Sequence, residues 1–90
     1  MEKDDNNKLK IELVSIGILS ELAKIRAYGI KKYDTDSWRA IDKSRLYAAL
    51  MRHIIAWREG EMYDKESKMP HLSHALCNMM FLMQKEGIIK

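Results

Sequence analysis

The chain has 90 residues, a net charge of +3 and a pI near 9.0. That length fits one domain with a small core, which is marginal unless self-association supplements it. The single cysteine, Cys77, excludes an intrachain disulfide, and the charge is too low for a dedicated DNA- or RNA-binding protein. The polar start lacks a signal-peptide pattern and no apolar stretch could cross a bilayer, so we expect a cytoplasmic protein.

The first predicted helix follows a polar start, residues 1–8, that we expect to be flexible. Apolar residues recur at helical spacing from Leu9 to Ala27, and further apolar residues widen that face. The helix is expected to end near Tyr28, with Gly29 in the left-handed cap position. Its broad apolar surface predicts contacts on two sides.

The second predicted helix follows a structured loop. Residues Lys31 to Lys43 carry clustered Asp, Thr and Ser without a helical apolar period, which is typical of a loop. Asp42 or Ser44 can cap the helix that follows, and Gly60 is expected to end it. One stripe of this helix holds Leu46, Leu50, His53 and Trp57, which turns His53 inward.

The third predicted helix follows an acidic connection from residue 60 to 69. Pro70 lies in its first turn, and the helix runs to about Lys85 with Gly87 as its stop. Three helices without an alternating strand pattern predict an all-α bundle over residues 9–90. The apolar surface of the first and third helices exceeds what three helices can bury, so we expect a homodimer or higher oligomer.

Carboxylates and imidazoles gather around the turn between the second and third helices. The set that could converge on one ion is His53, Glu61, Asp64, Glu66, His71 and His74. Glu61 and Asp64 are three residues apart, a spacing that places both carboxylates on one face of a helix, and oxygen ligation favours Mg²⁺ or Mn²⁺ over zinc. The alternative is a solvent-facing acidic loop beside histidines that are buried and satisfied by their neighbours.

The charge distribution suits a ligand that is both anionic and metal-bound. Residues 24–52 hold eight Lys or Arg against three Asp, whereas residues 53–67 hold four acids against two bases. Cations and aromatics in the loop can hold phosphates and stack a base, while Arg52 can clamp phosphate and a helix start binds anions. The candidate ligand contacts are Lys31, Lys32, Tyr33, Trp38, Arg39, Arg52, His71 and Asn78. Equally, the loop could be a surface segment that Trp38 anchors in the core.

A series of motifs resembles a known family. The motifs are Gly29-Ile30-Lys31-Lys32-Tyr33, Ser37-Trp38-Arg39, Ala49-Leu50-Met51-Arg52-His53, Gly60-Glu61, Asp64, Glu66-Ser67, Pro70-His71-Leu72, His74-Ala75 and Asn78. This series is similar to the phage dATP/dGTP diphosphohydrolase N-terminal family, related in concept to helical MazG-like pyrophosphohydrolases. Where that family usually reads Ser-Gly-Leu-Pro-His, this chain reads Ser67-Lys68-Met69-Pro70-His71.

The resemblance implies hydrolysis of a purine deoxynucleoside triphosphate to its monophosphate and pyrophosphate, with Mg²⁺ or Mn²⁺ as cofactor, in a phage or prophage protein. It implies that Glu61, Asp64, His53 and His74 approach the metal, the first three as catalytic residues. Glu21, expected to point inward from the first helix, could add a carboxylate. Arg52 and Lys32 would meet the phosphates, and Trp38 or Tyr33 the base.

Two other functions are open at this stage. One is a non-catalytic module that sequesters a nucleotide in the same pocket. The other is a protein interaction adaptor, in which the histidines are core residues and the apolar surfaces meet another protein.

Overall fold

The computed structural model describes residues 8–90 and contains three α-helices and two short 3₁₀-helices. They are η1 (Ile11–Leu13), α1 (Gly17–Lys32), η2 (Ser37–Ala40), α2 (Lys43–Arg58) and α3 (His71–Lys85). The part of the chain that is described has no β-strand, so the all-α prediction is confirmed. The predicted flexible start, except for Lys8, lies outside the described residues.

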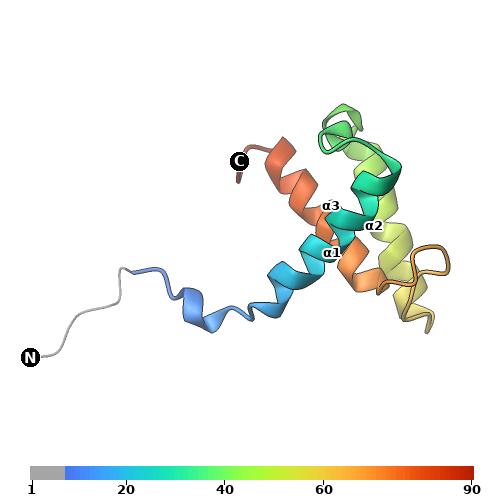
Figure 1. The fold of residues 1–90 in the computed structure, drawn as a ribbon, viewed down its shortest axis with the longest axis horizontal. Helices are drawn as coiled ribbons and strands as arrows, with labels where there is room; N and C mark the ends of the chain where they lie inside the picture. The colour runs from blue at the N-terminus through green and yellow to red at the C-terminus, as the bar shows by residue number, and fades with distance from the viewer. Residues whose placement is uncertain (1–7) are drawn as a thin grey trace, which may run out of the picture.

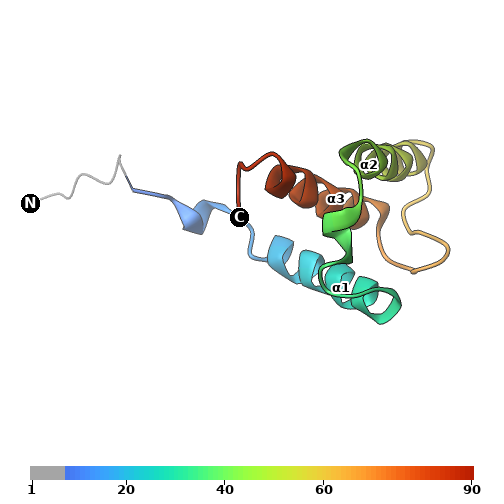
Figure 2. The same ribbon diagram turned by 90° about the horizontal axis from the view of Figure 1, so that it is seen from above.

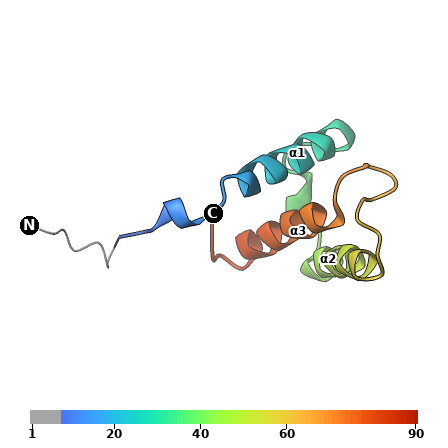
Figure 3. The ribbon, with the colours of Figure 1, turned by 90° about the horizontal axis from the view of Figure 1, so that it is seen from below.

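The third helix forms the middle of the molecule. Figures 2 and 3 show α3 between α1 on one side and α2 on the other, and η2, green in Figure 1, lies in the segment that connects the two outer helices. The buried core is the cluster Ile25, Trp38, Leu46, Cys77 and Phe81. The rings of Trp38 and Phe81 stack at 4.6 Å between centroids, which fixes the η2 segment onto α3. Trp38 therefore anchors its segment in the core, as one of the two interpretations of that loop proposed.

The first helix differs from its prediction at both ends. It begins at Gly17 rather than near Leu9, because the preceding residues are exposed and no neighbouring element packs against an apolar face there. It also continues through Gly29 to Lys32, and Tyr33 leaves it in an extended conformation with φ −137°. The left-handed cap predicted for Gly29 is therefore wrong.

The second and third helices follow their predictions closely. Asp42 occupies the N-cap position of α2, although its side chain makes no capping hydrogen bond, and Gly60 follows that helix with a φ of +101°. α3 ends at Lys85 as predicted, and Gly87 has a φ of +79°. Glycine tolerates this left-handed conformation without a steric cost.

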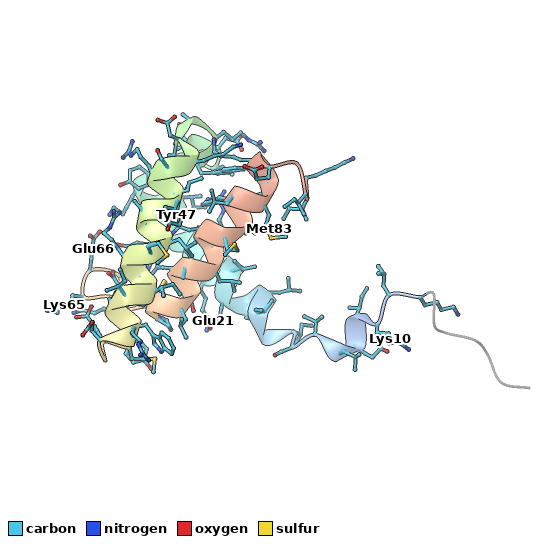
Figure 4. The ribbon with its side chains drawn as sticks, turned by 180° about the vertical axis from the view of Figure 1, so that it is seen from behind. Lys10, Glu21, Tyr47, Lys65, Glu66 and Met83 are labelled. Carbon is cyan, nitrogen blue, oxygen red and sulfur yellow. The ribbon has the colours of Figure 1, made fainter. Side chains whose placement is uncertain are left out.

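The residues before α1 expose many apolar side chains. Leu9, Leu13 and Ile16 are 85%, 76% and 78% exposed. Figure 3 shows this segment extending away from the three helices, and Figure 4 marks it with Lys10. Exposed apolar surface of this kind is typical of an interface, and the predicted oligomer stays a prediction. No described helix is long and apolar enough to span a membrane.

Backbone hydrogen bonds close the connection between α2 and α3. The N–H of Asp64 donates to the Met69 carbonyl at 2.8 Å, and the N–H of Lys68 donates to the Asp64 carbonyl at 2.8 Å. At the base of the loop, the His71 N–H donates to the Met62 carbonyl at 2.9 Å. Within this tight turn Lys68 has a φ of +64°, a left-handed conformation in which its Cβ is strained.

Replacing Lys68 by glycine should therefore stabilise the protein. We expect Lys68→Gly to raise the free energy of unfolding by roughly 1 kcal/mol, because relief of the Cβ strain exceeds the added entropy of the unfolded chain. Urea denaturation followed by circular dichroism measures this. The control is Lys68→Ala, which removes the long side chain but keeps the Cβ and should give no gain. Equal stability of both variants would contradict the strain argument.

Candidate metal centre

Three side chains from three segments meet at one end of the bundle. His53 comes from the third turn of α2, Asp64 from the connecting loop and His71 from the first position of α3. One ligand atom from each lies within 4.8 Å of the other two. Two imidazoles and one carboxylate that converge in this way are a recognised donor set for a divalent transition-metal ion. We call these three residues the His-Asp-His group.

Glu61 supports this group from the far side of the His71 ring. Its Oε1 lies 2.6 Å from His71 Nε2, and that hydrogen bond is the main cause that lowers the pKa of Glu61. An ionised carboxylate only accepts hydrogen bonds, so His71 Nε2 carries the proton. In the neutral ring Nδ1 then presents its lone pair. Carboxylates orient metal-binding histidines in this manner.

The lone pair of His71 Nδ1 points at His53. The two Nδ1 atoms are 2.8 Å apart, so in the metal-free chain His53 Nδ1–H donates to His71 Nδ1. Two nitrogens that bind one ion at right angles, each about 2.1 Å from it, are about 3.0 Å apart. The observed separation is therefore close to what a shared ion needs. Binding would require the His53 proton to move to Nε2.

The pKa values of His53 and Asp64 favour the protonation states in which these side chains can bind a cation. Burial, followed by the neighbouring His74 and His71, lowers the pKa of His53 to about 4, so this ring is neutral at pH 7. Burial alone would raise the pKa of Asp64, but hydrogen bonds from Ser67 outweigh it and the pKa is lowered. The Ser67 N–H donates to Asp64 Oδ2 at 2.7 Å. The neutral His53 imidazole and the ionised Asp64 carboxylate match the protonation states that metal ligation requires.

The donor set bears on the choice of ion, which stays a prediction. Mg²⁺ or Mn²⁺ was predicted from oxygen ligands at Glu61 and Asp64, but these residues do not share a helix face because the segment is a loop. Two imidazole nitrogens beside one carboxylate suit a transition-metal ion better than Mg²⁺, which prefers oxygen and water, and of the two predicted ions Mn²⁺ is the transition metal.

Three residues expected at the metal lie elsewhere. Glu61 binds His71 rather than facing the shared point, as described above. His74 stacks on His53 at 4.6 Å, and its Nε2 is 2.7 Å from Ser67 Oγ. Glu21 accepts a hydrogen bond from Ser73 Oγ at 2.7 Å and pairs with Lys24. Figure 4 shows Glu21 on α1, apart from the loop that carries Lys65 and Glu66.

The Lys and Arg side chains that were predicted to contact phosphates differ from one another in their surroundings. Lys32, at the end of α1, forms an ion pair with Glu66, which also accepts a hydrogen bond from Tyr28 Oη at 2.9 Å. Arg52 is exposed, and its charge contributes to the low pKa of His53, which places it near the His-Asp-His group. Lys31 is exposed on the last turn of α1, whereas Arg39 pairs with Asp36 and lies over the Trp38 ring.

An adjoining cavity contains several of the expected base contacts. It has a volume of about 430 Å³ and lies between α1, η2, α2 and α3. Tyr33, Trp38 and Asn78 line it, whereas His71 does not and is 4% exposed behind the loop. His74 also lines the cavity, so one side chain separates it from His53.

Sequence reasoning gave no role to Tyr28 or Ser67. Tyr28 lines the cavity and lies edge-on to His74 with 6.2 Å between ring centroids. Ser67 holds both Asp64 and His74. The spacing Asp64-x-x-Ser67 is a signal for such a turn, because an Asp side chain commonly accepts from backbone N–H groups a few residues ahead.

Comparison with known proteins gives the family of the chain. Residues 1–89 match the family described as dATP/dGTP diphosphohydrolase, N-terminal. The chain belongs to this family. A dATP/dGTP diphosphohydrolase of Salmonella phage PMBT28 is 29% identical over 80 residues, which cover 89% of this chain and 28% of that protein. No solved structure matches the chain significantly.

The wall of the cavity contains a thiol whose reactivity tests the structure. Burial raises the pKa of Cys77 to about 11. At pH 7 the thiolate fraction should be about 100-fold lower than in the unfolded chain, so alkylation by iodoacetamide should be slower by at least that factor. The rate should increase as the pH rises from 7 towards 11. Mass spectrometry with and without denaturant measures it, and equal rates at pH 7 would contradict the burial of Cys77.

Proposed function

We propose that this domain binds a divalent transition-metal ion at the His-Asp-His group and hydrolyses a purine deoxynucleoside triphosphate. The products are the deoxynucleoside monophosphate and pyrophosphate. The observation that carries the proposal is the convergence of His53, His71 and Asp64 within 4.8 Å, with Glu61 orienting one imidazole. The family supports the reaction, since the phage relative that spans more than three times this length is called a dATP/dGTP diphosphohydrolase.

The chemistry divides between the ion and the chain. When bound, the ion would polarise a phosphate oxygen and lower the pKa of water, and three protein ligands leave coordination positions for both. In the reaction a water oxygen bonds to the α-phosphorus, the bond from that phosphorus to the bridging oxygen breaks, and pyrophosphate departs. A proton is released from the attacking water.

The residues of the chain position these groups. Glu61 holds the His71 ring, and Ser67 holds the Asp64 carboxylate through its backbone N–H. Arg52, the exposed cation near His53, is the candidate to neutralise charge on the phosphates. Lys32 could add a second positive charge if phosphate competes with Glu66 for its ammonium group.

The reaction gives a direct test. The wild-type chain should release pyrophosphate from dGTP in the presence of Mn²⁺, and Asp64→Asn and His53→Gln should abolish both Mn²⁺ binding and release. Glu61→Gln should weaken Mn²⁺ binding by roughly 10- to 100-fold, because it removes the carboxylate that orients His71. Isothermal calorimetry measures binding, and a coupled pyrophosphate assay measures the reaction.

The matched control is Glu59→Gln. This acid is exposed just beyond α2, and its carboxylate makes no hydrogen bond or ion pair within residues 8–90. It should behave as wild type. Pyrophosphate release that persists in EDTA, or an equal loss in Glu59→Gln, would contradict the proposed centre. Binding of Mn²⁺ and dGTP with the nucleotide recovered intact would replace hydrolysis by nucleotide sequestration, which was the second function open from the sequence.

A further inference from the structure

The cavity beside the cation site has the properties of a site for a flat heterocycle. Its volume of about 430 Å³ is in the range of small-molecule sites. The stacked rings of Trp38 and Phe81 and the side chains of Ile25 and Leu46 give it an apolar wall. Planar bases bind to such walls by stacking and apolar contact.

Three polar groups along the cavity have unused hydrogen-bonding capacity. Asn78 Nδ2 donates to the His74 carbonyl at 3.1 Å, which leaves the Asn78 amide oxygen as an acceptor. The Asp34 carboxylate and the Arg45 guanidinium make no hydrogen bond or ion pair within the described chain. The cavity therefore offers two acceptors and one strong donor to a ligand.

One side chain, His74, separates the cavity from the His-Asp-His group. His74 lines the cavity and also stacks on His53, a member of the His-Asp-His group. In a nucleotide, the sugar separates the base from the phosphates. A base in the cavity would therefore leave its phosphates directed towards the cation site.

We infer that this cavity binds the purine base, with Asp34, Arg45 and Asn78 as the groups that select it. This inference rests on the proposed nucleotide-hydrolysing function and assigns the base of that nucleotide to this cavity. Guanine presents an imino and an amino N–H side by side to a carboxylate, and its O6 and N7 accept from arginine. Adenine keeps the N7 acceptor and one amino group, whereas thymine has no amino group. The expected order of affinity is guanine, then adenine, then thymine.

The test uses Trp38 as the reporter, in a Trp57→Phe background that leaves it the sole tryptophan. Fluorescence is titrated with dGMP in EDTA, so that no metal contributes. We expect saturable quenching by dGMP, weaker binding of dAMP and least of dTMP. 2-Deoxyribose 5-phosphate, which lacks the base, should not quench.

The variants identify the selecting groups. Asp34→Ala should weaken dGMP binding about tenfold, because it removes a hydrogen-bonded carboxylate. The matched control is Asp36→Ala, whose side chain pairs with Arg39 and does not line the cavity, and which should bind as wild type. Circular dichroism confirms that both variants fold. Equal affinity for dTMP and dGMP, or an unchanged affinity in Asp34→Ala, would overturn the inference.

The experiments can contradict either proposal without contradicting the other. If the wild type hydrolyses dGTP with Mn²⁺ but dGMP does not quench Trp38 and Asp34→Ala leaves KM unchanged, the base site is wrong and the hydrolytic centre stands. If dGMP binds as expected in EDTA but neither Mn²⁺ binding nor pyrophosphate release is found, the base site stands and the hydrolytic function is wrong.

Discussion

The hydrogen bond between Glu61 and His71 is the interaction on which the site depends. It joins the start of the connecting loop to the first residue of α3, and its 2.6 Å length is short for a hydrogen bond between nitrogen and oxygen, as bonds to a charged carboxylate tend to be. Because the carboxylate accepts a hydrogen bond from Nε2–H, the opposite nitrogen of the ring is available to His53 or to a cation. Without this bond, His71 could turn or change tautomer, and the three donors would lose their common point.

The connecting loop is built to hold that arrangement. Its backbone is closed by the bonds of Asp64 with Met69 and Lys68 and of His71 with Met62, while Ser67 fixes the Asp64 carboxylate. The strained conformation of Lys68 is one cost of the turn. Such strain persists only where the surrounding structure enforces it, and here it adjoins the candidate metal centre.

The sequence predicted the elements whose signals are local. Gly60 and Gly87 mark the ends of the second and third helices because only glycine adopts the left-handed cap conformation freely. Gly29 gave the same prediction, which was wrong, because Gly29 lies inside α1. That helix continues to Lys32, and the extended residue Tyr33 follows it. The start of α1 depends on packing, and periodicity alone could not show that residues 9–16 have no described neighbour to pack against.

The candidate site was predictable as a set of residues but not as a geometry. His53, Asp64 and His71 were all expected near the turn. The spacing argument placed Glu61 beside Asp64 on a helix, but the segment is a loop and Glu61 faces His71 instead. Glu21 was expected inward, yet its partner is Ser73, fifty-two residues away in the chain. Contacts across such distances depend on how the helices pack, which a single sequence does not specify.

The central claim is that His53, Asp64 and His71 together hold one metal ion. Anomalous diffraction from crystals soaked with Mn²⁺ tests it most directly, because the signal locates the ion independently of any activity. The account predicts one strong peak in contact with His53 Nδ1, His71 Nδ1 and an Asp64 oxygen, with Glu61 still bound to His71 Nε2. A peak held by Glu61 and Glu66 instead, or none near these histidines, would contradict it.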